Sequence, residues 1–428
     1  MNTGATGARA ILAASMGNLL EWYDFAVYAL FAIPIAANFF PGERPGIDLI
    51  NAFLFFGAGF VIRPAGAIVM GIYGDRAGRK AALMLTILLM ASGTLIIAAA
   101  PTYAVIGLGA PVVLLAGRLL QGFSAGGEIG SAAAYLVEHA PPRRRATFAA
   151  WLQGSMGMSN ILGALVAFTI SATLAPAQIV HWGWRLPFFL GLAIVPLGVY
   201  LRRTLEETPA FLIEQAHPVR APLRSVVRDH GRELLAGFGI SIPWAAAVYV
   251  LLIYMPTYLQ KSQGFTPMQA FGGSLVENVV FVIGCFAFGA LADRLGHAKV
   301  QARGALALFF GVLPLFWWIS HTHSAAAHLA ALAALGLIAA SFTSVAPSVL
   351  SHLFPTRVRV TGVSLVYNAA FTIFGGFAPA ILLKWFASGA AGAALAPAWY
   401  VTLAAIPALL AMRSATRSPR WEAPIQET

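Results

Sequence analysis

The chain reads Gly-Ile-Tyr-Gly-Asp-Arg-Ala-Gly-Arg-Lys from Gly71 to Lys80, and this stretch decides the fold. It is a short charged loop between two apolar segments, Leu49–Tyr73 and Ala81–Ala100, each long enough to cross a bilayer. A related stretch, Gly-Ala-Leu-Ala-Asp-Arg-Leu-Gly, runs from Gly289 to Gly296 after a later apolar segment. The chain therefore contains the same loop twice, each time after a predicted membrane span.

A second pair of matching segments supports an internal repeat. Pro-Pro-Arg-Arg-Arg-Ala-Thr at Pro141–Thr147 corresponds to Pro-Thr-Arg-Val-Arg-Val-Thr at Pro355–Thr361, with nearly the same offset as the first pair. We therefore predict two pseudo-symmetric six-helix bundles, at residues 1–201 and 233–428, joined by a polar cytoplasmic linker at 202–232. Duplicated halves of this kind place the solute site of a transporter near the membrane midplane.

Composition favours a lipid environment, because 59% of the residues are hydrophobic and only 10% are charged, against about a quarter in soluble domains. A spanning helix needs ~20 apolar residues, and twelve segments qualify, which predicts an all-α membrane protein. The expected spans are Ile11–Phe40, Leu49–Tyr73, Ala81–Ala100, Val105–Val137, Phe148–Leu174, Trp184–Leu201, Leu234–Leu259, Phe271–Ala292, Ala302–Ile319, Ala326–Leu350, Val360–Phe386 and Ala398–Met412.

The net charge of +11 does not indicate a nucleic-acid partner. Most of the 27 lysines and arginines fall in loops that alternate onto one side of the predicted bundle, as the positive-inside rule requires of a membrane protein. That side is cytoplasmic, so both termini are expected inside. We expect a multi-pass protein of the inner (plasma) membrane that contacts lipid and works as a monomer.

The loop at Gly71–Lys80 resembles the loop-two motif of the major facilitator superfamily. Four further stretches narrow the resemblance to the metabolite–proton symporter family, which includes carriers of citrate, tricarballylate, 2-oxoglutarate, shikimate and proline/betaine. These stretches are Gly-Asn-Leu-Leu-Glu-Trp-Tyr-Asp-Phe at Gly17–Phe25, Arg-Leu-Leu-Gln-Gly-Phe-Ser-Ala-Gly-Gly-Glu at Arg118–Glu128, Trp-Gly-Trp-Arg-Leu-Pro-Phe at Trp182–Phe188, and Phe-Pro-Thr-Arg-Val-Arg-Val-Thr-Gly at Phe354–Gly362.

The resemblance covers the whole chain and implies proton-coupled uptake of a small polar metabolite. The second-half loop departs from the pattern, with His297 where the first half has Arg79. The glycines Gly126 and Gly127 are common to several members of the family and do not identify a solute.

Six charged side chains fall inside predicted spans and away from their ends, where each costs ~2.5–3.5 kcal/mol unless it has a partner or water. They are Glu21, Asp24, Arg63, Arg118, Glu128 and Glu277. Glu21, Asp24 and Tyr28 share one face of the first helix by their spacing. We interpret this face as binding solute or carrying the proton. Asp24 is the first candidate carrier, then Glu21 and Glu128, and Glu277 in the eighth span is a further candidate for proton coupling. The alternative is that one carboxylate only neutralises Arg118 or Arg63.

Arg118 is the main candidate for solute contact, because a guanidinium stays charged and binds carboxylates in a bidentate manner. Gln121 lies on the same helix face, and we expect Gln121 and Arg63 to assist Arg118 in solute binding. A static salt bridge with Asp24 is the structural alternative for Arg118. The uncharged candidates for solute contact, each of which could equally be a helix–helix hydrogen bond, are Gln153, Asn160, Tyr367 and Asn368.

A cytoplasmic gate is expected where the repeated loops meet. Asp75 should lie near the start of the eleventh span, where backbone donors and the helix dipole favour an anion. The gating candidates are Asp75, Arg76, Arg79, Glu138, Arg143, Arg145, Asp293, Arg294 and Arg357.

The spans and the internal repeat predict a secondary transporter that works by alternating access. The family resemblance implies uptake of a small organic acid together with protons, and we expect a di- or tricarboxylate such as citrate. Uptake of a zwitterion such as betaine or proline, or of a shikimate-like acid, is the alternative within transport, and a membrane sensor with a transporter fold is the alternative outside it. The sequence has no phosphate-binding loop of the nucleotide type and no arrangement of a nucleophile and a base. We therefore expect no enzyme activity, no cofactor and no metal, with the proton gradient as the energy source.

Overall fold

A computed structural model describes residues 3–42, 46–77, 79–203, 222–322, 324–355, 358–390 and 392–415. Within these ranges the chain is helical, with no strand. The expectation of an all-α protein is confirmed for this part of the chain.

The first half contains helices that match the first six predicted spans, several of them divided. The helices are α1 (Thr3–Leu30), α2 (Ala32–Phe39), α3 (Ile47–Val61), α4 (Arg63–Ala77), α5 (Arg79–Ala99), α6 (Tyr103–Ile106), α7 (Gly109–Ala125), α8 (Glu128–His139), α9 (Arg145–Thr173), α10 (Pro176–His181) and α11 (Leu186–Arg203).

The second half repeats this pattern and adds two π-helical segments. Its elements are α13 (Pro222–Asp229), α14 (Gly231–Ala246), the π-helix Ala247–Ile253, α15 (Met255–Ser262), α16 (Pro267–Leu295), α17 (His297–His321), α18 (Ala325–Thr343), α19 (Ala346–Leu353), α20 (Arg359–Ala370), the π-helix Phe371–Gly376, α21 (Ala378–Ala387) and α22 (Ala396–Ala415). The predicted division at 201 and 233 falls close to the end of α11 and the start of α14.

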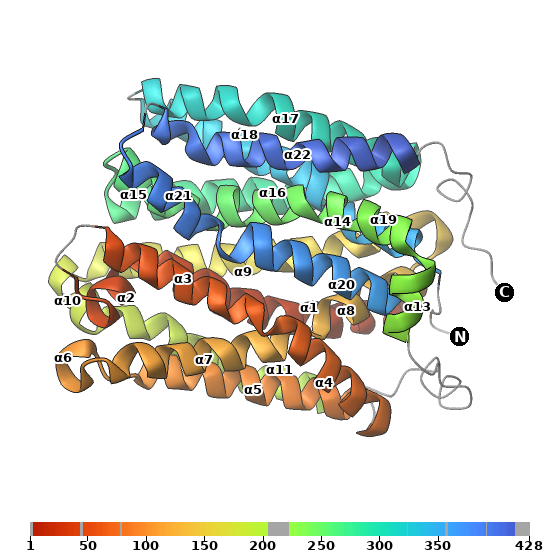
Figure 1. The fold of residues 1–428 in the computed structure, drawn as a ribbon, viewed down its shortest axis with the longest axis horizontal. Helices are drawn as coiled ribbons and strands as arrows, with labels where there is room; N and C mark the ends of the chain where they lie inside the picture. Colours follow the sequence, from red (N-terminus) through yellow and green to blue (C-terminus); the bar gives the residue numbers. More distant parts are fainter. Residues whose placement is uncertain are drawn as a thin grey trace.

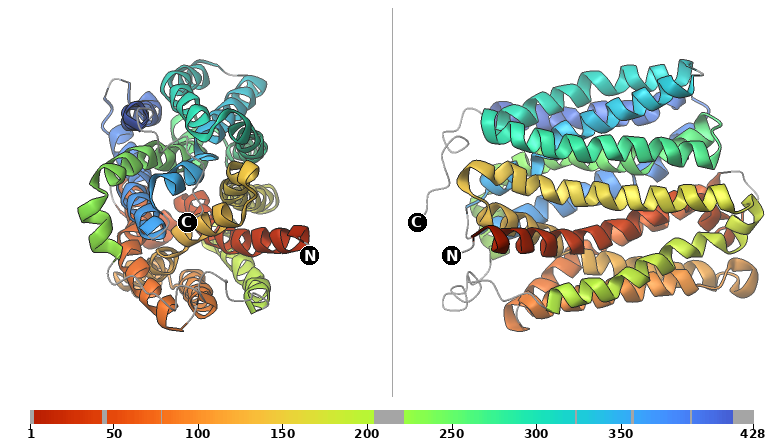
Figure 2. Two further views of the ribbon diagram at one scale, coloured as in Figure 1. Left: turned by 90° about the vertical axis from the view of Figure 1, so that its right-hand side faces the viewer. Right: turned by 180° about the vertical axis from the view of Figure 1, so that it is seen from behind.

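The long helices run side by side along the longest axis of the molecule (Figure 1). In that view most of the first-half helices fill the lower part and most of the second-half helices the upper part. The halves meet along α9 and α16, and again where α3 packs against α21 and the second π-helix. The end-on view in Figure 2 shows the helices as bundled rods seen along their axes. The start of α1 and the end of α22 lie at the same end of the bundle, as the prediction of two termini on one side requires.

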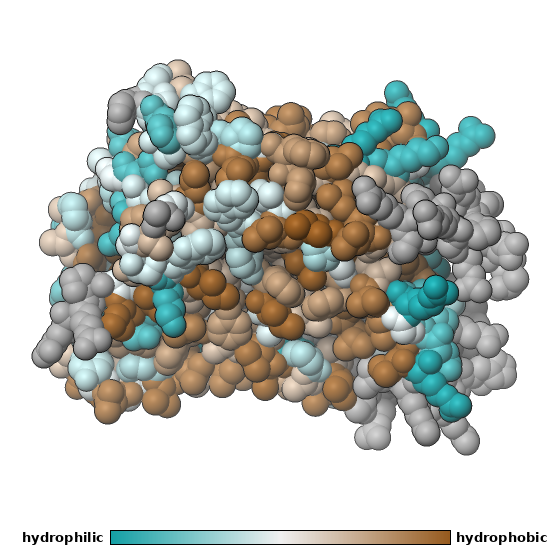
Figure 3. Space-filling model, turned by 45° about the horizontal axis from the view of Figure 1, so that its top comes forward, coloured by the Kyte–Doolittle hydropathy of each residue, from teal (hydrophilic) through white to brown (hydrophobic). Residues whose placement is uncertain are grey.

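The outer surface is apolar in a broad band between more hydrophilic ends (Figure 3). Nine helical stretches of the described chain are long and apolar enough to cross a membrane, and α1 with α2 makes a tenth bent by 66°. The other two predicted spans coincide with α5 and with the pair α7 and α8. The bend after α1 precedes Pro34, which cannot donate a backbone hydrogen bond within a helix.

Close packing of α3 and α4 against α7 brings two arginines of the site together. A Cβ on Gly122 would lie 1.7 Å from the carbonyl oxygen of Gly59, and a Cβ on Gly126 would lie 2.0 Å from that of Arg63. Only glycine permits these approaches, a common device in membrane helices, where association depends on close contact. Gly126, one of the two adjacent glycines noted in the sequence, therefore has a packing function.

Candidate functional site

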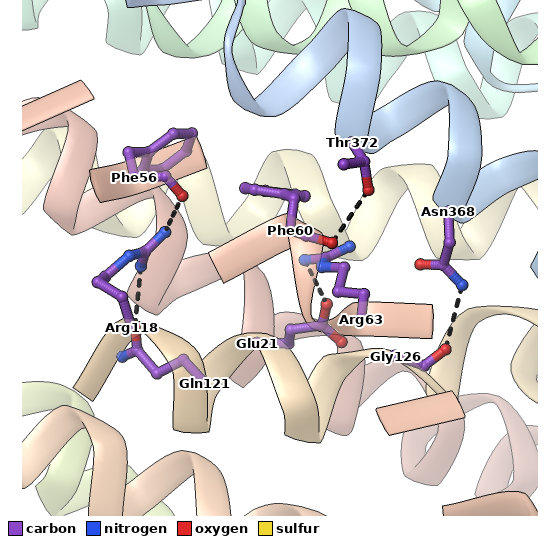
Figure 4. Close-up of polar contacts among 9 residues, drawn as sticks. All are labelled: Glu21, Phe56, Phe60, Arg63, Arg118, Gln121, Gly126, Asn368 and Thr372. Atoms are coloured by element: carbon purple, nitrogen blue, oxygen red, sulfur yellow. Dashed lines mark hydrogen bonds and ion pairs between the residues drawn. The ribbon is translucent and has the colours of Figure 1, made fainter. Parts of the chain in front are cut away.

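Arg118 lies fully buried in α7, surrounded by aromatic rings. Its guanidinium donates to Gln121 Oε1 at 2.8 Å and to the carbonyl oxygen of Phe56 at 3.1 Å (Figure 4). The guanidinium carbon lies 4.5 Å from the ring centroid of Tyr28 and 4.7 Å from that of Phe25. Among the described residues no carboxylate forms a salt bridge with it, and its Nε has no acceptor. A buried cation with an unused donor is suited to bind an anion.

Arg63, at the start of α4, has a carboxylate partner. Its Nη2 lies 3.1 Å from Glu21 Oε1 of α1, and both side chains are buried (Figure 4). The guanidinium carbon lies 4.2 Å from the Phe60 centroid and 4.8 Å from that of Phe25. The structure therefore realises for Glu21 and Arg63 the neutralising pair considered as an alternative in the sequence.

Asp24 of α1 does not form an ion pair with either arginine. It accepts hydrogen bonds from Thr94 of α5 and, at 3.3 Å, from Gln121 Nε2. Gln121 also accepts from Arg118, so its amide stands between the cation and the carboxylate. The alternative of a direct salt bridge between Arg118 and Asp24 is wrong, because the Gln121 side chain lies between the two groups and bonds to both.

Thr94 is a site residue that sequence reasoning missed. It donates to Asp24 and accepts from Gln121 Nε2 at 3.0 Å. A small cavity between α1, α5 and α11 is lined by both Asp24 and Thr94. A lone threonine in an apolar span carries no distinctive signal, since it also bonds its own helix, here at Met90.

Several uncharged candidates hold the structure together. Tyr28 donates to the Ala52 carbonyl at 3.0 Å, and Gln153 accepts from Trp244 Nε1 at 3.1 Å. Asn368 donates to the Gly126 carbonyl at 3.2 Å, across the boundary between the halves (Figure 4). The ring of Tyr367 stacks on Phe371 at 3.8 Å. Their contacts match the alternative of helix–helix bonding, although each also faces the junction of the halves or the arginine cluster.

Asn160 is an exception, because both polar atoms of its buried side chain lack a partner among the described residues. It lines a small cavity between the halves with Ala26, Leu30, Leu252, Ile253 and Ser274. A buried amide without a partner costs about 1–3 kcal/mol, so a bound polar group would stabilise this position.

The remaining two acidic candidates stand apart from this cluster. Glu277 is fully buried in α16, and in the described part of the chain neither carboxylate oxygen has a partner. Its backbone carbonyl lies 2.3 Å from where a Cβ on Gly336 would be, so it faces the contact with α18. Glu128 begins α8 and is only partly buried. The structure does not bring Glu277 to Arg118.

The repeated loop of the second half forms a contact between the halves. Asp293, near the end of α16, accepts from the backbone amides of Ala146 and Thr147 at 2.8 and 3.0 Å, at the first turn of α9. His297 Nε2 lies 3.7 Å from Asp293. The carboxylate thus caps a helix of the other half, where the helix dipole favours an anion.

The other gating candidates are less informative. Arg143 and Arg294 are exposed, and Arg145 is partly buried with an unpartnered Nε among the described residues. Arg357 and the side chains of Asp75, Arg76, Arg79 and Glu138 lie outside the described residues. The predicted position of Asp75 at the eleventh span stays a prediction, while its counterpart Asp293 occupies the corresponding position on the fifth.

The sequence is similar to a known family of transporters and to characterised members of it. Residues 10–225 match the family model described as "Sugar (and other) transporter". The chain is 36% identical to the citrate-proton symporter of Klebsiella pneumoniae over 420 residues, covering 96% of this chain and 93% of that protein. It is 33% identical to the proline/betaine transporter of Escherichia coli K12 over 416 residues, covering 94% and 82%.

Solved structures share the fold. The proton:xylose symporter bound to 6-bromo-6-deoxy-D-glucose superposes with a TM-score of 0.79 at 18% identity, covering 97% of this chain and 96% of that one. A partially occluded, inward-open structure of the xylose transporter from E. coli gives a TM-score of 0.78 at 18% identity. At this identity the likeness concerns architecture alone.

Proposed function

The chain belongs to the sugar (and other) transporter family of the major facilitator superfamily, and we propose that it is a proton-coupled symporter for a small organic acid, most consistent with a di- or tricarboxylate such as citrate. Membership makes it a multi-pass membrane transporter and not an enzyme. The solute class and the coupling ion are the proposal, together with the assignment to the inner membrane.

The observation that carries this proposal is the pair of buried arginines around Phe25. The guanidinium carbons of Arg63 and Arg118 lie 4.8 and 4.7 Å from the centroid of that ring. Arg118 has no ion-pair partner among the described residues. An acid with several carboxylates offers one group to Arg118 and a second to Arg63, whose Glu21 partner can be displaced or protonated. Bidentate binding of carboxylates is the chemistry to which arginine is best suited.

The proton step uses Asp24 and Gln121. Arginine does not titrate in proteins and histidines are scarce inside the spans, so carboxylates at membrane depth are the candidates for the coupling group. A solute carboxylate that takes over Arg118 displaces the Gln121 oxygen, and Asp24 loses its link to a positive charge. Asp24 then gains a proton, which offsets one negative charge of the solute as the site changes its exposure from one side of the membrane to the other. The proton enters down the pH gradient, and the membrane potential adds ~2.3 kcal/mol per 100 mV for each net positive charge that moves inward with the solute. Glu21 and then Glu128 are the next candidate carriers.

Alternating access requires the contacts between the halves to break at one end at a time. The contact of Asp293 with the start of α9 supports a gate at the end where both termini lie. Its two hydrogen bonds with backbone amides join α16 to α9. Beside the arginine cluster Gly57 of α3 packs on Phe377 of the second half, where a Cβ would lie 2.5 Å from the ring. An occluded state requires the halves to close on both sides of the arginine cluster at once.

A zwitterion is the second candidate solute, and the aromatic residues favour it. Tyr249 and Phe371 pack on Trp22 close to the arginine cluster, with ring centroids 5.9 and 6.4 Å away. Aromatic faces bind quaternary ammonium groups, and a zwitterion such as betaine needs one carboxylate site beside one such surface. The relatives include both citrate symporters and proline/betaine transporters, which correspond to these two classes of solute.

Thermal unfolding of the purified protein with citrate, tricarballylate, shikimate, proline and glycine betaine tests the proposal, since a ligand of the folded state raises its stability. We expect citrate or tricarballylate to raise the melting temperature most. Proton-driven uptake of the same solute into proteoliposomes should then collapse when the pH gradient is removed. A shift with betaine alone would replace the first solute class by the second, and no shift with any of them would contradict both. Binding without any transport would support the sensor alternative.

A further inference from the structure

Tyr249 has a hydroxyl that the transport cycle described above does not use. The side chain is fully buried in the π-helix Ala247–Ile253, in the second half of the chain. Among the described residues no group donates to or accepts from its hydroxyl. Leaving such a group unsatisfied costs about 1–3 kcal/mol, and buried polar groups without a partner are uncommon. A bound polar group that accepts a hydrogen bond from this hydroxyl would therefore stabilise the protein.

The surroundings of Tyr249 indicate which partner it is. Its ring packs edge-on against Phe56 and Phe60, with centroids 5.9 and 5.3 Å away. The guanidinium groups pack on the same two rings. The guanidinium carbon of Arg118 lies 4.8 Å from the Phe56 centroid, and that of Arg63 lies 4.2 Å from the Phe60 centroid. Tyr249 therefore shares Phe56 and Phe60 as neighbours with the two arginines, and it approaches them from the opposite half of the molecule.

Three other hydrogen-bond donors of the second half in this region already have acceptors. Thr372 donates to the Phe60 carbonyl at 3.0 Å, and Trp244 donates to Gln153. The Asn368 amide donates to the Gly126 carbonyl. The phenolic proton of Tyr249 is therefore a free donor. Its π-helix adds a further indication, because π-bulges occur frequently at functional sites.

We propose that Tyr249 is the solute-contacting donor of the second half, and that its hydroxyl binds a carboxylate oxygen of the solute held by Arg118 and Arg63. The assignment rests on the proposed function, because it takes a carboxylate to occupy the arginine cluster. Its consequence is specific: the solute links the first half, through arginines, to the second, through a phenol. Such a link stabilises the closed state only when solute is bound, which couples occupancy to the movement of the halves.

The test measures the Kd of citrate, and of glycine betaine as a second carboxylate probe, by calorimetry on the purified full chain. Tyr249→Phe keeps the ring and removes the donor. The matched control is Tyr258→Phe. It removes a hydroxyl that donates to the Ala394 carbonyl at 3.1 Å and does not belong to the arginine cluster. We expect Tyr249→Phe to weaken binding about tenfold, and Tyr258→Phe to change it less than twofold.

Stability separates this role from a structural one. Because the Tyr249 hydroxyl has no partner without solute, Tyr249→Phe should melt at the same temperature as the wild type or higher, and should lose most of the stabilisation by solute. Unchanged affinity in Tyr249→Phe, with wild-type binding intact, would overturn the assignment and leave the proposed function standing. A variant that fails to fold would also overturn it, since the hydroxyl would then have a structural partner. Wild-type protein that binds neither probe would remove the proposed function, and the assignment with it.

Discussion

The two halves of the molecule share a scaffold but differ in what they bury. The first half buries Glu21, Asp24, Arg63 and Arg118 near one another, linked through Gln121 and through the ring of Phe25. The second half has one buried carboxylate in its described part, that of Glu277, and neither of its oxygens has a partner there. Around the junction the second half contributes aromatic rings and neutral donors.

This difference shows that duplication copied the helices and the loops but not the chemistry. The repeated loop of the second half forms a contact between the halves, because Asp293 caps α9. The same role for its counterpart Asp75 stays a prediction. Charged side chains at membrane depth are costly and persist where they have a function. Solute charge and proton exchange are therefore expected in the first half, and closure over the solute in the second. Four substitutions test that division.

The largest effect is expected for Asp24→Asn, which keeps the shape of the side chain and removes its proton exchange. The amide stays neutral, so solute binding no longer requires a proton, and accumulation driven by a pH gradient should be abolished. Exchange of labelled solute for unlabelled solute across proteoliposome membranes should persist. Accumulation with the normal pH dependence would show that Asp24 is not the carrier, and the same test would then move to Glu21 and Glu128.

Arg118→Lys should follow, with about a hundredfold loss of solute affinity. Lysine keeps the charge but lacks the planar fork that can bind a carboxylate and Gln121 at once. Calorimetry on the purified variant measures the loss. The control is Arg143→Lys, the same exchange at an exposed position, which should bind as the wild type does. Normal affinity in Arg118→Lys would refute direct contact with the solute.

Asp293→Asn tests whether the loop contact gates the bundle, and a tenfold slower uptake is expected. Asp293 accepts from the two α9 amides on separate oxygens, and the single oxygen of asparagine can keep only one of these hydrogen bonds. The variant also loses the charge that the helix start and His297 stabilise, so the end at which the termini lie should open more readily. A cysteine introduced at this end would be labelled faster in the variant. Equal labelling rates in the variant and the wild type would count against a gating role.

The smallest effect is expected for Glu277→Gln. A fully buried carboxyl without a partner is stable only in its neutral form, and glutamine reproduces that form closely. Uptake, its pH dependence and the melting temperature should stay within about twofold or a few degrees of the wild type. A changed number of protons per solute, measured from the reversal of flux against a known pH gradient, would place a second proton site in the second half and break the comparison.

The sequence by itself determined the architecture and the candidates. Hydropathy and the repeated loops predicted a helical membrane protein in two halves, because lipid permits few other ways of satisfying backbone groups. The cost of charge in lipid identified Glu21, Asp24, Arg63 and Arg118 without any knowledge of their partners.

Tertiary structure alone decided the pairing. Helical spacing places side chains on a face but says nothing about which neighbouring helix supplies a partner. The close approach at Gly59 and Gly122 sets α3 against α7, and only then does Arg63 pair with Glu21 while Gln121 stands between Arg118 and Asp24. Electrostatic interactions depend on distances between residues far apart in the chain, and those distances are set by packing.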